Sequence, residues 1–148
     1  MNMKIETEAK LLAIKYGVIS LDEIIKWADE NIQSSIDPDP NFIDLSLSKN
    51  MGEAVSSLIA FGISDDKTKV AKLTFKYFYK FLKSGRSSYQ KISKGLFDMA
   101  LEGYFPGNDT ESEMYSYWDS LDLAIMGSYG DPEEIKIQML DFIMKNMG

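Results

Sequence analysis

Residues that start and stop helices recur along this chain of 148 residues, and the apolar residues between them keep helical spacings of three and four. Ser20 with Glu23, and Asn50 with Glu53, are pairs that cap a helix start, because the side chains bind backbone N–H groups that have no partner inside the helix. Gly17 is expected to end the first helix, since glycine readily adopts the left-handed C-terminal cap. These start and stop residues, together with the helical spacing, predict a chain built almost wholly of helices.

The spacing predicts seven or eight helices, and no run of alternating apolar and polar residues is bounded by hairpin turns. The expected helices cover about 5–16, 20–32, 40–47, 51–61, 66–83, 89–102, 110–126 and 132–143. Ser64 and Asp65 are expected to start the fifth of these. We therefore predict an all-α fold, a single domain over residues 1–148, with short loops between the helices of one bundle.

The chain has no Cys and no His. This excludes a thiol nucleophile, an imidazole base, an ordinary zinc site and a haem held by His or Cys. Neither of the glycine-rich phosphate-binding motifs occurs. We expect no cofactor, no metal and no enzymatic activity. A carboxylate-based enzyme or small-ligand protein stays open as an alternative, and it would need a deep pocket lined by two carboxylates in unlike environments.

The first residues carry Glu6 and Glu8 before any long apolar run, which is not typical of a signal or transit peptide. Uninterrupted apolar stretches reach only three or four residues, as at Leu11–Ile14, far short of a membrane span. We expect a cytoplasmic protein that does not contact a membrane.

Charge is segregated along the chain, although the net charge is only −7. Residues 65–94 hold 9 basic and 2 acidic residues, whereas residues 95–135 hold 10 acidic residues and no basic one. The basic region includes a row of lysines at helical spacing: Lys69, Lys72, Lys76, Lys80 and Lys83. We interpret this row as a solvated helix face opposite Val70, Thr74, Phe78 and Phe81. Nucleic acid is not an expected partner, because a chain with a pI near 4.6 repels a polyanion over most of its surface.

Aromatic residues stand among the carboxylates of the acidic region. On a helix from about Thr110, a buried stripe is predicted at Met114, Trp118, Leu121 and Ile125. The opposite face then carries Glu111, Tyr115, Asp119 and Asp122, with Glu113 and Tyr117 at its flank. Tyrosine beside carboxylates suits the binding of a basic protein, because the ring gives rigid contact area and the charges steer association.

The candidate partner-binding residues are Asp109, Glu111, Glu113, Tyr115, Tyr117, Asp119 and Asp122. An alternative interpretation is an acidic surface kept for solubility, in which Asp109 and Glu111 also oppose the dipole of the helix N-terminus.

Three segments resemble a known family: Tyr16-Gly17-x-Ile19-Ser20, Ile24-Ile25-x-Trp27-Ala28-Asp29 and Pro40-x-Phe42-Ile43-Asp44-Leu45-Ser46. Over about residues 10–62 the chain is similar to small helical immunity proteins of bacterial contact-dependent growth-inhibition and related polymorphic toxin systems. The resemblance implies a cytosolic, non-catalytic protein that blocks the C-terminal domain of a cognate toxin, often a basic nuclease. It assigns no binding residues, because these proteins vary most where they touch the toxin.

A second class of function is a helical regulatory or scaffold module that docks its partners through a hydrophobic groove. Met139, Met144 and Met147 would contribute a methionine-rich surface to such a groove. A large exposed apolar patch away from the acidic face would favour this class. In either class we expect a monomer before the partner binds.

Overall fold

A computed structural model describes residues 3–85 and 88–148, and within these ranges the protein has eight α-helices and no strand. The predicted all-α fold is confirmed. The helices are α1 (Met3–Lys15), α2 (Leu21–Gln33), α3 (Pro40–Ser46), α4 (Met51–Ile59), α5 (Lys67–Lys83), α6 (Tyr89–Leu101), α7 (Glu111–Ile125) and α8 (Pro132–Asn146). No helix in the described ranges combines the length and the apolar composition that a membrane span needs.

The two predicted capping pairs are confirmed in their hydrogen bonds. The Ser20 side chain accepts from the backbone N–H of Glu23 at 3.2 Å, and Asn50 accepts from that of Glu53 at 2.9 Å. The start of α5 differs from the prediction, because Asp66 is its N-cap. Ser64 instead donates its backbone N–H to the buried carboxylate of Glu8 at 2.9 Å.

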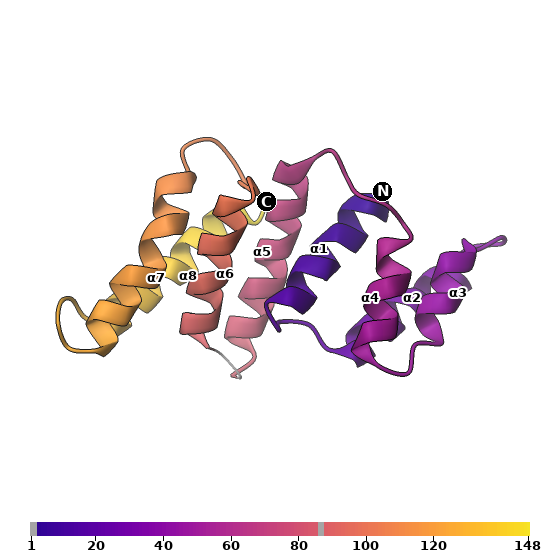
Figure 1. The fold of residues 1–148 in the computed structure, drawn as a ribbon, viewed down its shortest axis with the longest axis horizontal. Helices are drawn as coiled ribbons and strands as arrows, with labels where there is room; N and C mark the ends of the chain where they lie inside the picture. Colours follow the sequence, from indigo (N-terminus) through magenta and orange to yellow (C-terminus); the bar gives the residue numbers. More distant parts are fainter. Residues whose placement is uncertain (1–2, 86–87) are drawn as a thin grey trace. The chain divides into compact units, whose positions relative to one another are not determined.

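Two compact units divide the chain, the first ending at Asp65 and the second running from Asp66 to Gly148. Helices α1–α4 belong to the first unit and α5–α8 to the second (Figure 1). The prediction that the whole chain is one domain stays a prediction.

In the first unit, α4 contacts α1, α2 and α3, and α2 packs on α3. An aromatic row joins α2 to α3 and to the end of α4: Trp27 lies 5.2 Å from Phe42, and Phe42 lies 4.9 Å from Phe61, measured between ring centroids. The buried ammonium of Lys10 lies 3.8 Å from the Trp27 ring centre and 3.4 Å from the Glu6 carboxylate. Burial lowers the pKa of Lys10, and the Glu6 carboxylate opposes this shift.

In the second unit, α7 packs against both α6 and α8, and α8 also packs against α5 (Figure 1). The largest fully buried side chains of this unit come from all four helices: Phe75, Phe78, Ile92, Leu96, Met99, Met114, Leu121, Met139 and Ile143. This arrangement fixes both flanks of α7, which carries most of the candidate partner-binding residues.

The lysine row of α5 is exposed at all five positions, which confirms the predicted solvated face. On the opposite side Val70, Thr74 and Phe78 are buried, while Phe81 is half-buried. Lys67 lies apart from this row: its ammonium donates to the carbonyl of Glu102 at 2.7 Å and so helps to cap the end of α6.

Candidate protein-binding face

Helix α7 is rotated from the orientation that its apolar spacing predicts. The buried residues are Met114, Tyr117, Leu121 and Ala124, whereas the predicted stripe was Met114, Trp118, Leu121 and Ile125. Trp118 is half-buried and Ile125 is 47% exposed. The reason is that α7 has two neighbours, so α6 and α8 each take aromatic side chains from a different flank of the helix.

Tyr117 was expected at the flank of the exposed face, but the structure places it in the core, where it is only 5% exposed. Its ring lies 5.7 Å from that of Phe142 on α8. Its hydroxyl donates a hydrogen bond to the Glu113 carboxylate, one turn earlier, and also lies 3.4 Å from the carbonyl of Gln138. Burial raises the pKa of Tyr117, and the hydrogen bond to Glu113 raises it further.

The other aromatic flank of α7 meets a single ring of α6. The ring centroid of Phe97 lies 5.3 Å from that of Tyr115 and 5.0 Å from that of Trp118, and both pairs are edge to face. All three rings are half-buried, so they are held in place while part of each stays accessible. The ammonium of Lys94 lies 5.9 Å from the Trp118 ring centre.

The acidic face is defined here as Glu111, Tyr115, Asp119 and Asp122 of α7. Glu111 and Asp119 are exposed, and Asp122 is half-buried. In the part of the chain that the structure describes, no ion pair engages these three carboxylates. Their charges are therefore available to a partner, and the half-buried ring of Tyr115 lies between them along the helix.

Asp109 and Glu113 lie beside this face in different settings. Glu113 is exposed and accepts the hydrogen bond from the Tyr117 hydroxyl. Asp109 is exposed and precedes α7 with a backbone φ of 62°, a left-handed conformation that Asp adopts more readily than most residues. With Glu111 and Lys72 it lines a hollow of about 430 Å³ next to the start of α7. Both carboxylates are exposed, so this hollow does not give them the unlike environments that an acid/base pair needs.

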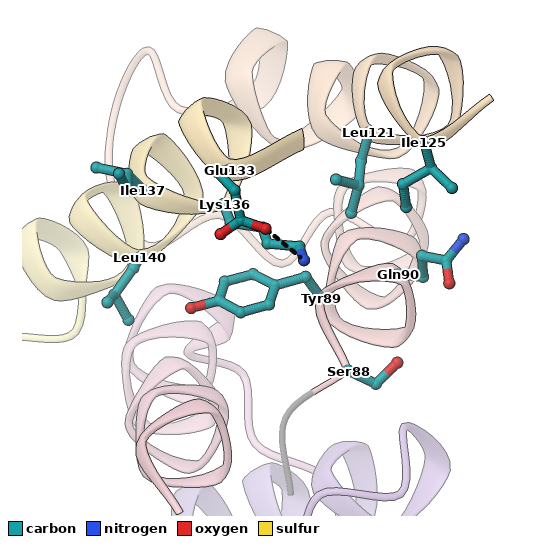
Figure 2. A pocket seen from close by; sticks show the side chains of 9 residues that line it. All are labelled: Ser88, Tyr89, Gln90, Leu121, Ile125, Glu133, Lys136, Ile137 and Leu140. Carbon is teal, nitrogen blue, oxygen red and sulfur yellow. Dashed lines mark hydrogen bonds and ion pairs between the residues drawn. The ribbon is translucent and has the colours of Figure 1, made fainter. Parts of the chain in front are cut away.

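A second hollow, of about 500 Å³, lies between the start of α6, the end of α7 and α8 (Figure 2). It was not predicted, because its wall combines residues from three helices that lie far apart in the sequence. Tyr89 contributes an aromatic ring, and Lys136 pairs with Glu133 at 3.2 Å. Its apolar members are Leu121, Ile125, Ile137 and Leu140.

The predicted methionine surface is only partly present. Met139 is fully buried in the core of the second unit, because α8 turns this position toward its neighbours. Met144 is exposed and Met147 is half-buried. Other exposed apolar side chains on α7, at its C-cap and on α8 are Leu123, Ile125, Met126 and Ile137.

Among residues 3–85 and 88–148, no group of three or more Asp, Glu, His or Cys side chains is placed to hold a metal ion. The comparisons with known proteins give no match: no family model, no curated protein and no solved structure is significantly similar to this chain. The resemblance to immunity proteins over residues 10–62 therefore stays a prediction.

Proposed function

We propose that this protein is a non-catalytic immunity protein that binds the C-terminal domain of a cognate bacterial toxin, with its acidic face directed at a basic surface of the toxin. The observation that carries the proposal is the row of exposed or half-exposed carboxylates on α7, none of which has an ion-pair partner in the described chain. A basic nuclease is the toxin class that such a face fits best.

The charge distribution supports a role in association. Residues 95–135 contain 10 acidic residues and no basic one. Lys72 and Lys94 lie near α7, but they are fewer than its carboxylates, so a cationic partner meets a net negative surface there. Charges of this kind mainly raise the association rate and select partners of opposite charge, and their effect falls as salt is added. We therefore expect fast, salt-sensitive association to a 1:1 complex.

The aromatic cluster supports a role in affinity. Tyr115 and Trp118 are held edge to face on Phe97 but keep accessible surface, so a partner orders few new side-chain torsions when it covers them. Aromatic anchors beside a charged rim are typical of the residues that dominate binding energy. The toxin class itself rests on the resemblance of residues 10–62, and the protein would act in the cytosol.

The test begins with the reading frame directly upstream of the gene, which should encode a long secreted toxin. Its C-terminal domain is purified, and binding is followed by stopped-flow kinetics at low and high salt. Reversing three charges with Glu111→Lys, Asp119→Lys and Asp122→Lys should slow association and weaken binding by several kcal/mol in sum. The same variant should also fail to protect cells that express the toxin.

A matched control reverses the exposed residues Asp29, Glu30 and Asp37 of the first unit to lysine, which changes the net charge by the same amount. This control should keep both protection and most of the association rate. If the α7 variant binds and protects like the unchanged protein, the acidic face is not the interface. If the upstream frame encodes no toxin, the proposal of an immunity protein is wrong.

A further inference from the structure

The hollow between α6, α7 and α8 has a mixed lining, with apolar residues from α7 and α8 and polar ones that include Ser88, Gln90 and the Glu133–Lys136 pair. Leu121 and Ile125 line it from α7, and Ile137 and Leu140 line it from α8 (Figure 2). The ring of Tyr89, from the start of α6, lies between Leu140 and Gln90 in the same view. Its accessible apolar surface comes from Ile125, Ile137 and Leu140, because Leu121 is fully buried. A partner side chain that covers these residues would remove apolar surface from water.

Exposed apolar side chains stand at this hollow. The lining residues Ile125 and Ile137 are 47% and 70% exposed, and Met126, the C-cap that follows α7, is 74% exposed. Isolated exposed apolar residues are common in proteins, but a group beside a concave site is typical of an interaction surface.

The charges around the hollow are mainly negative. Glu133 lines it and is exposed, and Asp131 and Glu134 stand beside Glu133 at the start of α8. On α7, Asp122 follows the lining residue Leu121. The lining cation Lys136 pairs with Glu133 at 3.2 Å, so these two charges offset each other. Asp131, Glu134 and Asp122 then outnumber Lys91, the cation that follows the lining residue Gln90. An occupant with apolar side chains and flanking cations matches this environment.

We propose that this hollow takes the apolar side of a basic amphipathic helix of the toxin domain and forms the central, water-excluding part of the interface. The inference rests on the proposed function, and it adds the chemistry of the partner segment: large apolar residues at helical spacing, flanked by Lys or Arg. Binding of a helix in a groove uses such spacing, with anchors at positions i, i+3, i+4 and i+7. Asp122 lies on the acidic face and adjoins the lining residues of α7, so the two surfaces are continuous along one helix.

The probe is a synthetic helical peptide of leucine and lysine with leucines on one face, and the control is a peptide of the same composition in scrambled order. Binding to the full chain is followed through its isoleucine methyl resonances. The amphipathic peptide should shift the methyls of Ile125 and Ile137 in a saturable way, and the scrambled peptide should not. Ile137→Lys should weaken binding about tenfold.

The matched control is Leu101→Lys, which introduces the same charge at a residue of α6 that is 63% exposed and lies outside the hollow. It should bind the peptide like the unchanged chain. Equal binding of both peptides, equal loss in both variants, or unmoved Ile125 and Ile137 methyls would each overturn the inference, and the methyl measurement needs no substitution.

The two proposals fail separately when the toxin domain is used in place of the peptide. If Ile137→Lys keeps full toxin affinity while the charge-reversed α7 variant loses it, the hollow is not part of the interface and the proposed function stands. If neither variant changes toxin binding, both proposals are wrong.

Discussion

The lysine row of α5 and the acidic face of α7 are both rows of charge on one side of an amphipathic helix, but their surroundings differ. Behind the lysines, α5 buries residues along most of its length, including Phe75 and Phe78. Behind the carboxylates, α7 divides its aromatic residues between α6 and α8. Both helices also carry half-buried rings, and these differ in what they contact. Tyr115 and Trp118 of α7 share one ring of α6, Phe97, whereas Tyr79 and Phe81 of α5 each lie near a lysine ammonium. A charged helix face thus has different potential for recognition, depending on what its accessible rings rest on.

The largest expected effect is on the free energy of unfolding, and it comes from replacing the aromatic residues behind the two faces. Phe78→Ala on α5 should lower the free energy of unfolding by about 3–5 kcal/mol, because it leaves a cavity at a fully buried position. Trp118→Ala should cost clearly less, because that ring is half-buried. Urea unfolding followed by circular dichroism measures both. Equal losses would mean that Trp118 belongs to the core and is not an accessible anchor.

A smaller effect is expected at the hydroxyl of Tyr117, which belongs to the core side of α7. The pKa of this hydroxyl is raised, mainly by burial, so the folded protein keeps its proton at a pH where the unfolded chain releases it, near 10.0. The stabilisation from this group is therefore complete below about pH 10 and is lost as the pH rises further. At pH 11 the loss should be on the order of 1 kcal/mol.

Tyr117→Phe is the matched variant, since it keeps the ring beside Phe142 and removes only the hydroxyl. Its free energy of unfolding should fall less steeply between pH 9 and pH 11 than that of the unchanged protein. Parallel pH profiles would show that Tyr117 ionises in the folded state as it does in the unfolded chain.

The smallest effect is expected on the lysine row itself. Replacing Lys72, Lys76 and Lys83 by glutamine should change the free energy of unfolding by no more than about 0.5 kcal/mol per site, because all three side chains are exposed. Binding to a basic toxin domain should persist, and association should become somewhat faster as repulsion falls. A loss of binding would show that the lysine face takes part in recognition, and the contrast between the two faces would disappear.

Local patterns predict the fold well, because a helix start depends on residues three apart. Ser20 and Asn50 show this, since their capping bonds form as expected. The orientation of α7 was harder to predict, since it carries large side chains on several sides and its neighbours decide which are buried. One local signal was available: Glu113 and Tyr117 are four residues apart on a helix, a spacing at which a carboxylate can satisfy a buried hydroxyl.

The hollow could not be predicted from the sequence, for a different reason. Tyr89, Ile125 and Ile137 are far apart in the chain, and only the packing of three helices brings them to one place. Helical spacing assigned Ile125 to the core as readily as Leu121, although one is 47% exposed and the other fully buried. Tertiary packing, which no short pattern encodes, decides between them.

The two tryptophans give each compact unit its own optical signal. Trp27 belongs to the first unit and lies beneath the ammonium of Lys10, while Trp118 belongs to the second and rests on Phe97. Because the chain has only 2 Trp, each single replacement by phenylalanine leaves one emitter that reports on one unit alone. Fluorescence of these two variants therefore separates the melting of residues up to Asp65 from that of the residues after it, and coincident curves would be the signature of a single cooperative domain.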